Sequence, residues 1–119
     1  MAKSFENLTI WKDGISLSGL IYLETKKFPK EELYGLTSQI RRAIISVPSN
    51  IAEGAGRSSQ KEFIRFINIS LGSLNEVESL LHVALELKYL EINDFNIIKE
   101  RVIKLGASIG AFKKHLAQV

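Results

Sequence analysis

The chain of 119 residues contains no cysteine and only two histidines. The absence of cysteine excludes disulfide bonds, thiol catalysis and zinc–thiolate sites. His82 and His115 lie far apart, and neither has a second imidazole three or four residues away to complete a metal-binding pair. The sequence also contains no Glu-x-x-His pair and no acid–base constellation. We therefore expect no enzymatic activity, no metal site and no cofactor.

Long apolar runs are missing as well. No window approaches 18 uninterrupted apolar residues, so the sequence predicts no membrane-spanning helix. The first residues lack the continuous apolar segment of a secretory signal peptide. These absences, together with that of cysteine, predict a cytoplasmic protein.

Proline is scarce, whereas apolar residues at helical spacing are abundant. Pro29 and Pro48 are the only prolines, and hydrophobic residues make up 45% of the chain against 24% charged residues. This composition is typical of a single globular domain, which we assign to residues 1–119. The 16 basic and 13 acidic residues give a net charge of +3, which permits contact with nucleic acid but does not require it.

Helical periodicity predicts four helices, over residues 5–28, 29–53, 58–89 and 94–117. Phe28-Pro29 separates the first two, because a residue that precedes proline disfavours the helical conformation. Ser59, followed by Glu62, has the spacing of a capping box at the start of the third helix. Four helices with short connections indicate an all-α fold, an antiparallel up-down-up-down four-helix bundle.

The first predicted helix is apolar on two faces. One stripe, which we expect to face the core, consists of Leu8, Trp11, Ile15 and Tyr22. The other stripe lies nearly opposite and consists of Ile10, Leu17 and Ile21. This second stripe requires either burial inside a larger body or contact with another subunit. Its three residues are therefore candidates for an oligomer interface.

Pro48 and several glycines interrupt the helical patterns. Pro48 either ends the second helix early or kinks it, and the apolar pattern that resumes at Ile51 favours a kink. The stretch 54–56, Gly-Ala-Gly, is expected to stop this helix. It also resembles a phosphate-binding loop, but it lacks the Lys-Ser/Thr ending of such a loop. Since glycine inside a helix is unfavourable, we expect close helix packing at Gly14, Gly19, Gly72, Gly106 and Gly110.

One face of the second helix mixes small polar residues with one cation and one anion. It consists of Ser38, Arg42, Ser46, Ser49 and Glu53. Three interpretations are open: an ordinary solvated surface, small residues that admit a neighbouring helix or subunit, or a site at which Arg42 contacts a ligand phosphate. The five residues are therefore further candidates for an oligomer interface.

Basic residues form several groups. Within one of them, Arg57, Lys61 and Arg65 recur at every fourth position and line one side of the start of the third helix. Each group alone is most simply a solvated surface, whereas several groups repeated in an oligomer could hold a phosphate backbone. No aromatic residue interleaves with them, so sequence-specific reading of single strands is not indicated. The nucleic-acid-binding candidates are Arg41, Arg42, Arg57, Lys61 and Arg65, together with Lys99, Lys104, Lys113 and Lys114, which we expect on the outward side of the fourth helix.

The run from Leu36 to Gly54, LTSQIRRAIISVPSNIAEG, resembles the signature of bacterial four-helix-bundle proteins encoded in intervening sequences of 23S ribosomal RNA genes. Further matching pieces are Phe5-Glu6-Asn7-Leu8, Gly56-Arg57-Ser58 and Gly72-Ser73-Leu74-Asn75-Glu76. The same family includes the accessory variability determinant of diversity-generating retroelements.

The resemblance implies an up-down bundle that assembles into a homopentameric ring and binds nucleic acid through a basic surface. For the retroelement branch it also implies docking on a reverse transcriptase. The leading hypothesis is a homo-oligomer that binds structured RNA or an RNA–DNA hybrid electrostatically, with weak sequence preference. The alternative is a scaffold that docks a partner enzyme such as a reverse transcriptase, in which the charges only keep the protein soluble.

Overall fold

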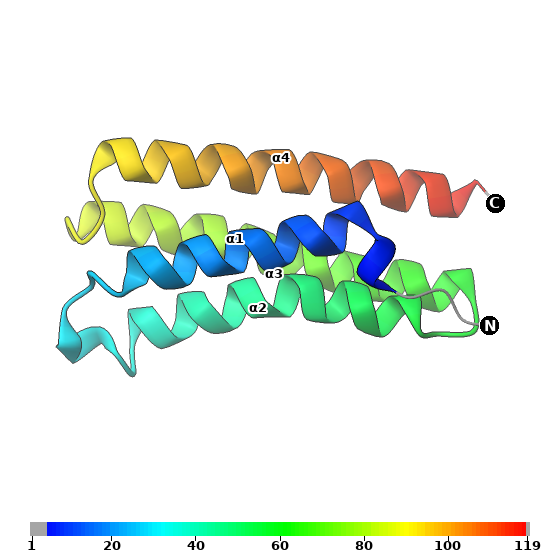
Figure 1. Ribbon diagram of the computed structural model, residues 1–119, viewed down its shortest axis with the longest axis horizontal. Helices are drawn as coiled ribbons and strands as arrows, with labels where there is room; N and C mark the ends of the chain where they lie inside the picture. Colours follow the sequence, from blue (N-terminus) through cyan, green and yellow to red (C-terminus); the bar gives the residue numbers. More distant parts are fainter. Residues whose placement is uncertain (1–4, 119) are drawn as a thin grey trace.

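The computed structural model describes residues 5–118, which form four long helices and, within this range, no strand. The helices are α1 (Thr9–Thr25), α2 (Leu36–Ala55), α3 (Gln60–Glu86) and α4 (Ile92–Ala117), with short 3₁₀ helices η1 (Phe5–Asn7) and η2 (Lys30–Glu32). Consecutive helices run in opposite directions along one axis (Figure 1), so the fold is the expected up-down-up-down bundle. It measures 45 × 23 × 20 Å, and α1 closes it by packing on α4. None of the helices described is long and apolar enough to span a membrane.

The second helix starts later than expected, at Leu36 and not at Pro29. Pro29 instead precedes η2, and Gly35 takes the N-cap position of α2. The Glu32 carboxylate accepts a hydrogen bond from the Leu36 N–H at 3.1 Å, which satisfies a donor that has no partner within the helix. Its second oxygen accepts a hydrogen bond from the Tyr89 hydroxyl at 3.0 Å, so Glu32 links the start of α2 to the end of α3.

The third helix begins as expected but ends three residues early. Ser59 is its N-cap, and the hydroxyl accepts a hydrogen bond from the Glu62 N–H at 3.1 Å. At the other end Lys88 adopts a φ of 63°, and the Tyr89 N–H donates to the Ala84 carbonyl at 3.0 Å. This bond and the left-handed residue before it define a Schellman motif, which terminates a helix. A lysine occupies the position that usually holds glycine.

Pro48 lies inside α2 without ending it. The helix continues to Ala55, so an early termination at the proline is excluded. Pro48 has no N–H to donate to the helix, and a hydrogen bond from α3 reaches the backbone beside it. The fully buried Ser70 hydroxyl donates to the carbonyl of Val47. The backbone of α2 beside the proline is therefore linked to α3 by a direct hydrogen bond.

The apolar stripes of α2, α3 and α4 form the core, but on α1 the second stripe is the buried one, whereas Leu8 and Trp11 of the first stripe pack only partly against the core. The side chains of Ile10, Leu17 and Ile21 are only 5%, 1% and 1% exposed, whereas Ile15 is 47% exposed. The prediction that these three buried residues form an oligomer interface is therefore wrong. The inward face also carries Gly14, where a Cβ would lie 3.2 Å from the Pro48 Cβ. The close approach of α1 to α2 at this glycine fixes which face turns inward.

Close packing explains only some of the other helical glycines. At Gly54, near the end of α2, a Cβ would lie 2.8 Å from Phe63 Cδ1 and 2.9 Å from Phe66 Cβ. At Gly106 a Cβ would make ordinary contact, 3.5 Å from Leu74. The prediction of close packing within the chain is wrong for three positions, because no atom lies within 4 Å of a Cβ at Gly19, Gly72 or Gly110.

Candidate functional site

The face of α2 that the sequence singles out is divided between different surfaces. Ser38, Arg42 and Ser46 line a groove of about 560 Å³ between α2 and α3. Ser49 instead lines a second groove, between α1 and α2, that is mostly apolar. Glu53 points to the α2–α3 loop, where it forms an ion pair. The five residues therefore do not form one continuous interface.

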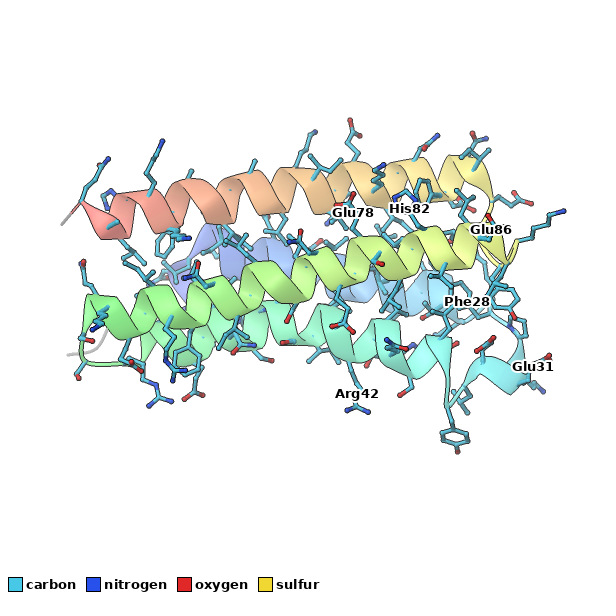
Figure 2. The ribbon with its side chains drawn as sticks, turned by 180° about the vertical axis from the view of Figure 1, so that it is seen from behind. Phe28, Glu31, Arg42, Glu78, His82 and Glu86 are labelled. Atoms are coloured by element: carbon cyan, nitrogen blue, oxygen red, sulfur yellow. The ribbon has the colours of Figure 1, made fainter. Side chains whose placement is uncertain are left out.

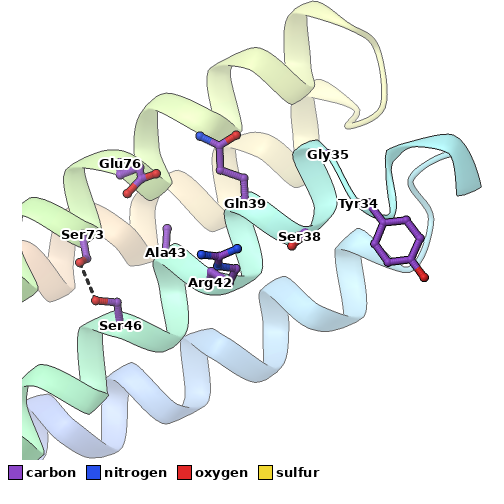
Figure 3. A pocket seen from close by; sticks show the side chains of 9 residues that line it. All are labelled: Tyr34, Gly35, Ser38, Gln39, Arg42, Ala43, Ser46, Ser73 and Glu76. Atoms are coloured by element: carbon purple, nitrogen blue, oxygen red, sulfur yellow. Dashed lines mark hydrogen bonds between the residues drawn. The ribbon is translucent and has the colours of Figure 1, made fainter.

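The groove between α2 and α3, here called the α2–α3 groove, is lined almost entirely by polar side chains. Figure 3 shows Tyr34 at one end, a pair of serines at the other end, and Arg42 and Glu76 between them. The residues that line it are Tyr34, Gly35, Ser38, Gln39, Arg42, Ala43 and Ser46 from the α2 side and Ser73 and Glu76 from α3. Such a surface favours a ligand that forms hydrogen bonds.

The serine pair at the end of the groove has one hydroxyl proton to spare. The Ser46 and Ser73 hydroxyl oxygens lie 2.8 Å apart and share a single hydrogen bond. The Asn50 amide also donates to the Ser46 hydroxyl oxygen, at 2.9 Å. Two hydroxyls carry two protons, and only one of these is used between them. Whichever serine donates, the other can donate to a ligand oxygen in the groove.

Arg42 differs from the other arginines in having no partner. Arg41, Arg57, Arg65 and Arg101 each form a hydrogen bond or an ion pair, whereas Arg42 forms neither within residues 5–118. In Figure 2 its side chain extends away from the bundle into solvent. An unpaired guanidinium presents five N–H donors in a planar fork that matches a phosphate or carboxylate.

Arg41, also a nucleic-acid-binding candidate, is used within the bundle. Its Nε donates to the Thr25 hydroxyl oxygen at 2.8 Å, and a terminal nitrogen donates to the Tyr22 carbonyl at 3.3 Å. Its guanidinium carbon lies 4.6 Å from the centre of the Tyr22 ring. A cation at the last turn of α1 also stabilises the negative end of the helix dipole. These contacts explain Arg41 as a link between α1 and α2.

Arg57 of the α2–α3 loop and Arg65 of α3 share one aromatic ring, that of Phe66. The guanidinium carbons of Arg57 and Arg65 lie 4.7 and 4.9 Å from the centre of the Phe66 ring. Arg57 pairs with Glu53 at 2.7 Å, and Arg65 pairs with Glu62 at 3.4 Å. The ring and the carboxylates hold both side chains in place at the surface.

The end of α4 meets the start of α3 and brings further cations to the same end of the bundle. The Phe63 and Phe112 rings form an edge-to-face contact with centres 5.5 Å apart. Lys61, two residues before Phe63, is exposed, and Lys113 and Lys114 follow directly after Phe112. We call this surface the basic end, and it comprises Arg57, Lys61, Arg65, Lys113 and Lys114.

The four lysines predicted on the outward side of α4 have different surroundings. Lys99 lies 5.6 Å from the centre of the Phe95 ring, and the same ring is 4.9 Å from the ring of His82 of α3. Lys104 lines a groove of about 260 Å³ between α4 and α1, together with Asp13. Of the four lysines, only Lys113 and Lys114 join the basic end.

Several large apolar side chains stand in solvent. On α3, Ile69, Val83 and Leu87 are exposed, and their spacings of 14 and 4 residues place them on the same side of the helix. Ile15 and Ile45 are exposed on α1 and α2. Exposed aliphatic side chains gathered on one helix face are typical of surfaces that contact another protein.

Tyr34, Ser73 and Glu76 also line the groove, although the sequence alone did not predict them as parts of a possible site. Tyr34 is 92% exposed at the entry to α2, and it lines the same groove as Arg42. The statement that no aromatic residue accompanies the cations is therefore wrong for this groove. The sequence does place an aromatic residue, Tyr34, directly before Gly35, the N-cap of α2. This signal was not recognised because Pro29 suggested an earlier start for the helix.

Comparison with known families agrees with the motif in α2. The model of one family, described as 23S rRNA-intervening sequence protein, matches residues 6–111 of this chain. The match spans the bundle from η1 to the last part of α4. A search among curated proteins found no match. With nearly its whole length matched, the chain belongs to the family of 23S rRNA-intervening sequence proteins.

Proposed function

We propose that the protein is a non-enzymatic homo-oligomer that binds structured RNA, or an RNA–DNA hybrid, through its basic end. The observation that carries this proposal is the meeting of cations from separate segments at that end. Arg57 comes from the α2–α3 loop, Lys61 and Arg65 from the start of α3, and Lys113 and Lys114 from the end of α4, which meets the start of α3 at the Phe63–Phe112 contact. Against the two carboxylates that pair with them, Glu53 and Glu62, these five cations leave a surplus of three.

The ion pairs at the basic end do not prevent phosphate binding. The side chains of Arg57 and Glu53 are both about half exposed, and the Arg65–Glu62 pair is similarly exposed. Exposed ion pairs of this kind contribute about 0–1 kcal/mol, so a phosphate can replace the carboxylate at little cost. The Phe66 ring keeps both guanidinium groups oriented while the partner changes.

Assembly supports the proposal because it multiplies a modest charge. A surplus of three per chain is small for a nucleic-acid-binding protein, but a ring of several copies presents it repeatedly on one surface. The exposed side chains of Ile69, Val83 and Leu87 offer apolar area for contacts between copies. The resemblance of the α2 signature implies a pentamer, and we propose that stoichiometry here.

The proposal is tested by light scattering and fluorescence anisotropy with a ribosomal RNA fragment at low and raised salt. We expect a particle near five chains that binds the RNA and releases it as salt increases, because phosphate contacts release counterions. The triple variant Lys61→Glu, Lys113→Glu, Lys114→Glu should lose this binding. A matched control is Lys99→Glu with Lys104→Glu, a half-buried and an exposed lysine outside the basic end. Equal losses in both variants, or binding that salt does not affect, would overturn the proposal.

The scaffold hypothesis is retained as a second candidate because of the apolar face of α3. Ile69, Val83 and Leu87 could contact a partner enzyme such as a reverse transcriptase in place of another copy. Under this hypothesis the variant Ile69→Ser with Val83→Ser keeps the particle mass of the wild type and loses only the partner. A particle that falls apart would instead assign the face to self-assembly.

A further inference from the structure

The α2–α3 groove contains a set of groups that the proposed function leaves unused. Its volume of about 560 Å³ is in the range of small-ligand sites, and it lies outside the basic end. It combines an exposed aromatic ring, an unpaired guanidinium, a spare hydroxyl donor and the amide of Gln39. We propose that this groove binds an unpaired nucleotide of RNA, an inference that rests on the RNA binding proposed above.

The guanidinium and the serine pair provide the site for the phosphate. Arg42 has no ion-pair partner within residues 5–118, so a phosphate does not have to displace a carboxylate from it. The spare hydroxyl proton of the Ser46–Ser73 pair can form a second hydrogen bond, either to a phosphate oxygen or to the ribose 2′-hydroxyl. Charged and neutral donors on the two walls of one groove fit this chemistry.

The aromatic ring provides the site for the base. Tyr34 is 92% exposed and stands at the end of the groove (Figure 3), where no side chain of the bundle covers the ring. A free aromatic face stacks on any base, and it can do so only when the base has left its own stack. Gln39 lines the same groove (Figure 3), and its amide carries both donors and an acceptor for a base edge.

Glu76 makes this groove different from the basic end. It lines the α3 wall without pairing with Arg42, and the formal charges of these two side chains sum to zero over the groove lining. A continuous phosphate backbone is therefore not attracted to it by charge. Binding must come from stacking and hydrogen bonds, and it should respond less to salt than binding at the basic end. The two surfaces thus divide the recognition of paired and unpaired RNA between them.

The test compares a labelled ten-nucleotide single-stranded RNA with its duplex by fluorescence anisotropy, using the full-length protein. The substitution Tyr34→Ala should weaken binding of the single strand about tenfold and leave binding of the duplex unchanged. Arg42→Ala should act in the same direction, and Tyr34→Phe should bind like the wild type because it keeps the ring. Lys99→Ala is the matched control, since that side chain lies outside the groove.

The outcomes separate this inference from the proposed function. Wild-type affinity of Tyr34→Ala and Arg42→Ala for the single strand overturns the groove and leaves the basic end untouched. Loss of duplex binding in the Lys61, Lys113 and Lys114 variant supports the basic end independently of the groove. A change in particle mass in either groove variant, measured by light scattering, overturns the inference because it assigns the groove to contacts between copies.

Discussion

Replacing Gly54 by alanine should destabilise the bundle, although alanine normally favours a helix. Gly54 is the second-last residue of α2 and is buried where the helix passes the start of α3. A Cβ at this position would lie 2.8 Å from Phe63 Cδ1, 2.9 Å from Phe66 Cβ and 3.2 Å from the Phe63 carbonyl oxygen. Real Cβ atoms do not approach other atoms below 3.0 Å, so the two helices must move apart.

The expected size of the effect follows from two opposing contributions. Forcing an extra methyl group into a packed contact costs about 1–3 kcal/mol. Alanine returns less than about 1 kcal/mol of helix propensity, since Gly54 lies near the helix end. The net loss of unfolding free energy should be about 1–2 kcal/mol, or a fall in Tm of roughly 4–8 °C for a domain of this size. The Phe66 Cβ cannot turn away, because it is attached directly to the backbone of α3.

Gly72→Ala is the matched control for this prediction. Gly72 lies in the middle of α3, and a Cβ there would have no atom within 4 Å. The same substitution should therefore stabilise the protein by about 0.5–1 kcal/mol. Both variants are unfolded in urea, followed by circular dichroism at one protein concentration, because the proposed assembly would make stability depend on concentration. Equal or higher stability of Gly54→Ala would refute the close helix contact on which the reasoning rests.

Three further substitutions test other contacts of the bundle, each by urea unfolding against the wild type. Arg41→Ala should cost about 2 kcal/mol, because a charged hydrogen bond to Thr25 and the ring contact are lost; an unchanged midpoint would contradict the structural role of this arginine. Lys88→Gly should stabilise by about 1 kcal/mol, since glycine adopts the positive φ without strain, and a loss would show that the left-handed turn is absent. The hydrogen bond from its hydroxyl to Glu32, together with burial, raises the pKa of Tyr89 above the ordinary value of 10.0. The stabilisation that this bond gives the folded state is therefore complete below pH 10 and is lost as the pH rises through the folded-state pKa. Tyr89→Phe should remove this alkaline loss, and identical pH profiles would argue against the bond.

The sequence was sufficient to predict elements whose signals are local. The capping serine of α3 needs only Ser59 and the N–H of Glu62, three residues away, and the structure confirms it. The main apolar stripes of α2, α3 and α4 are long and regular, and the structure confirms that they face the core. The end of α3 could not be predicted, because a lysine in the left-handed conformation has no sequence signal comparable to glycine.

Features that depend on how two helices pack against each other could not be predicted from the sequence. Helix α1 has two apolar faces, and the choice between them depends on Gly14 lying against Pro48, a residue 34 positions later. The same limit applies to the α2–α3 groove. Arg42 and Ser46 could be placed on one face of α2, but Glu76 became their neighbour only through the rotation of α3 about its axis. Spacing within one helix carries no information about that rotation.

The seam between α1 and α4 has a consequence for how the molecule folds and opens. Its contacts join the two ends of the chain; in the Arg101–Ser16 hydrogen bond, for example, the partners are 85 residues apart. All other contacts among the four long helices lie between neighbours along the chain, and these form early because short loops close at low entropic cost. The seam should therefore form last, and its amide hydrogens should exchange first in the native state, which makes it the place where a folded subunit opens.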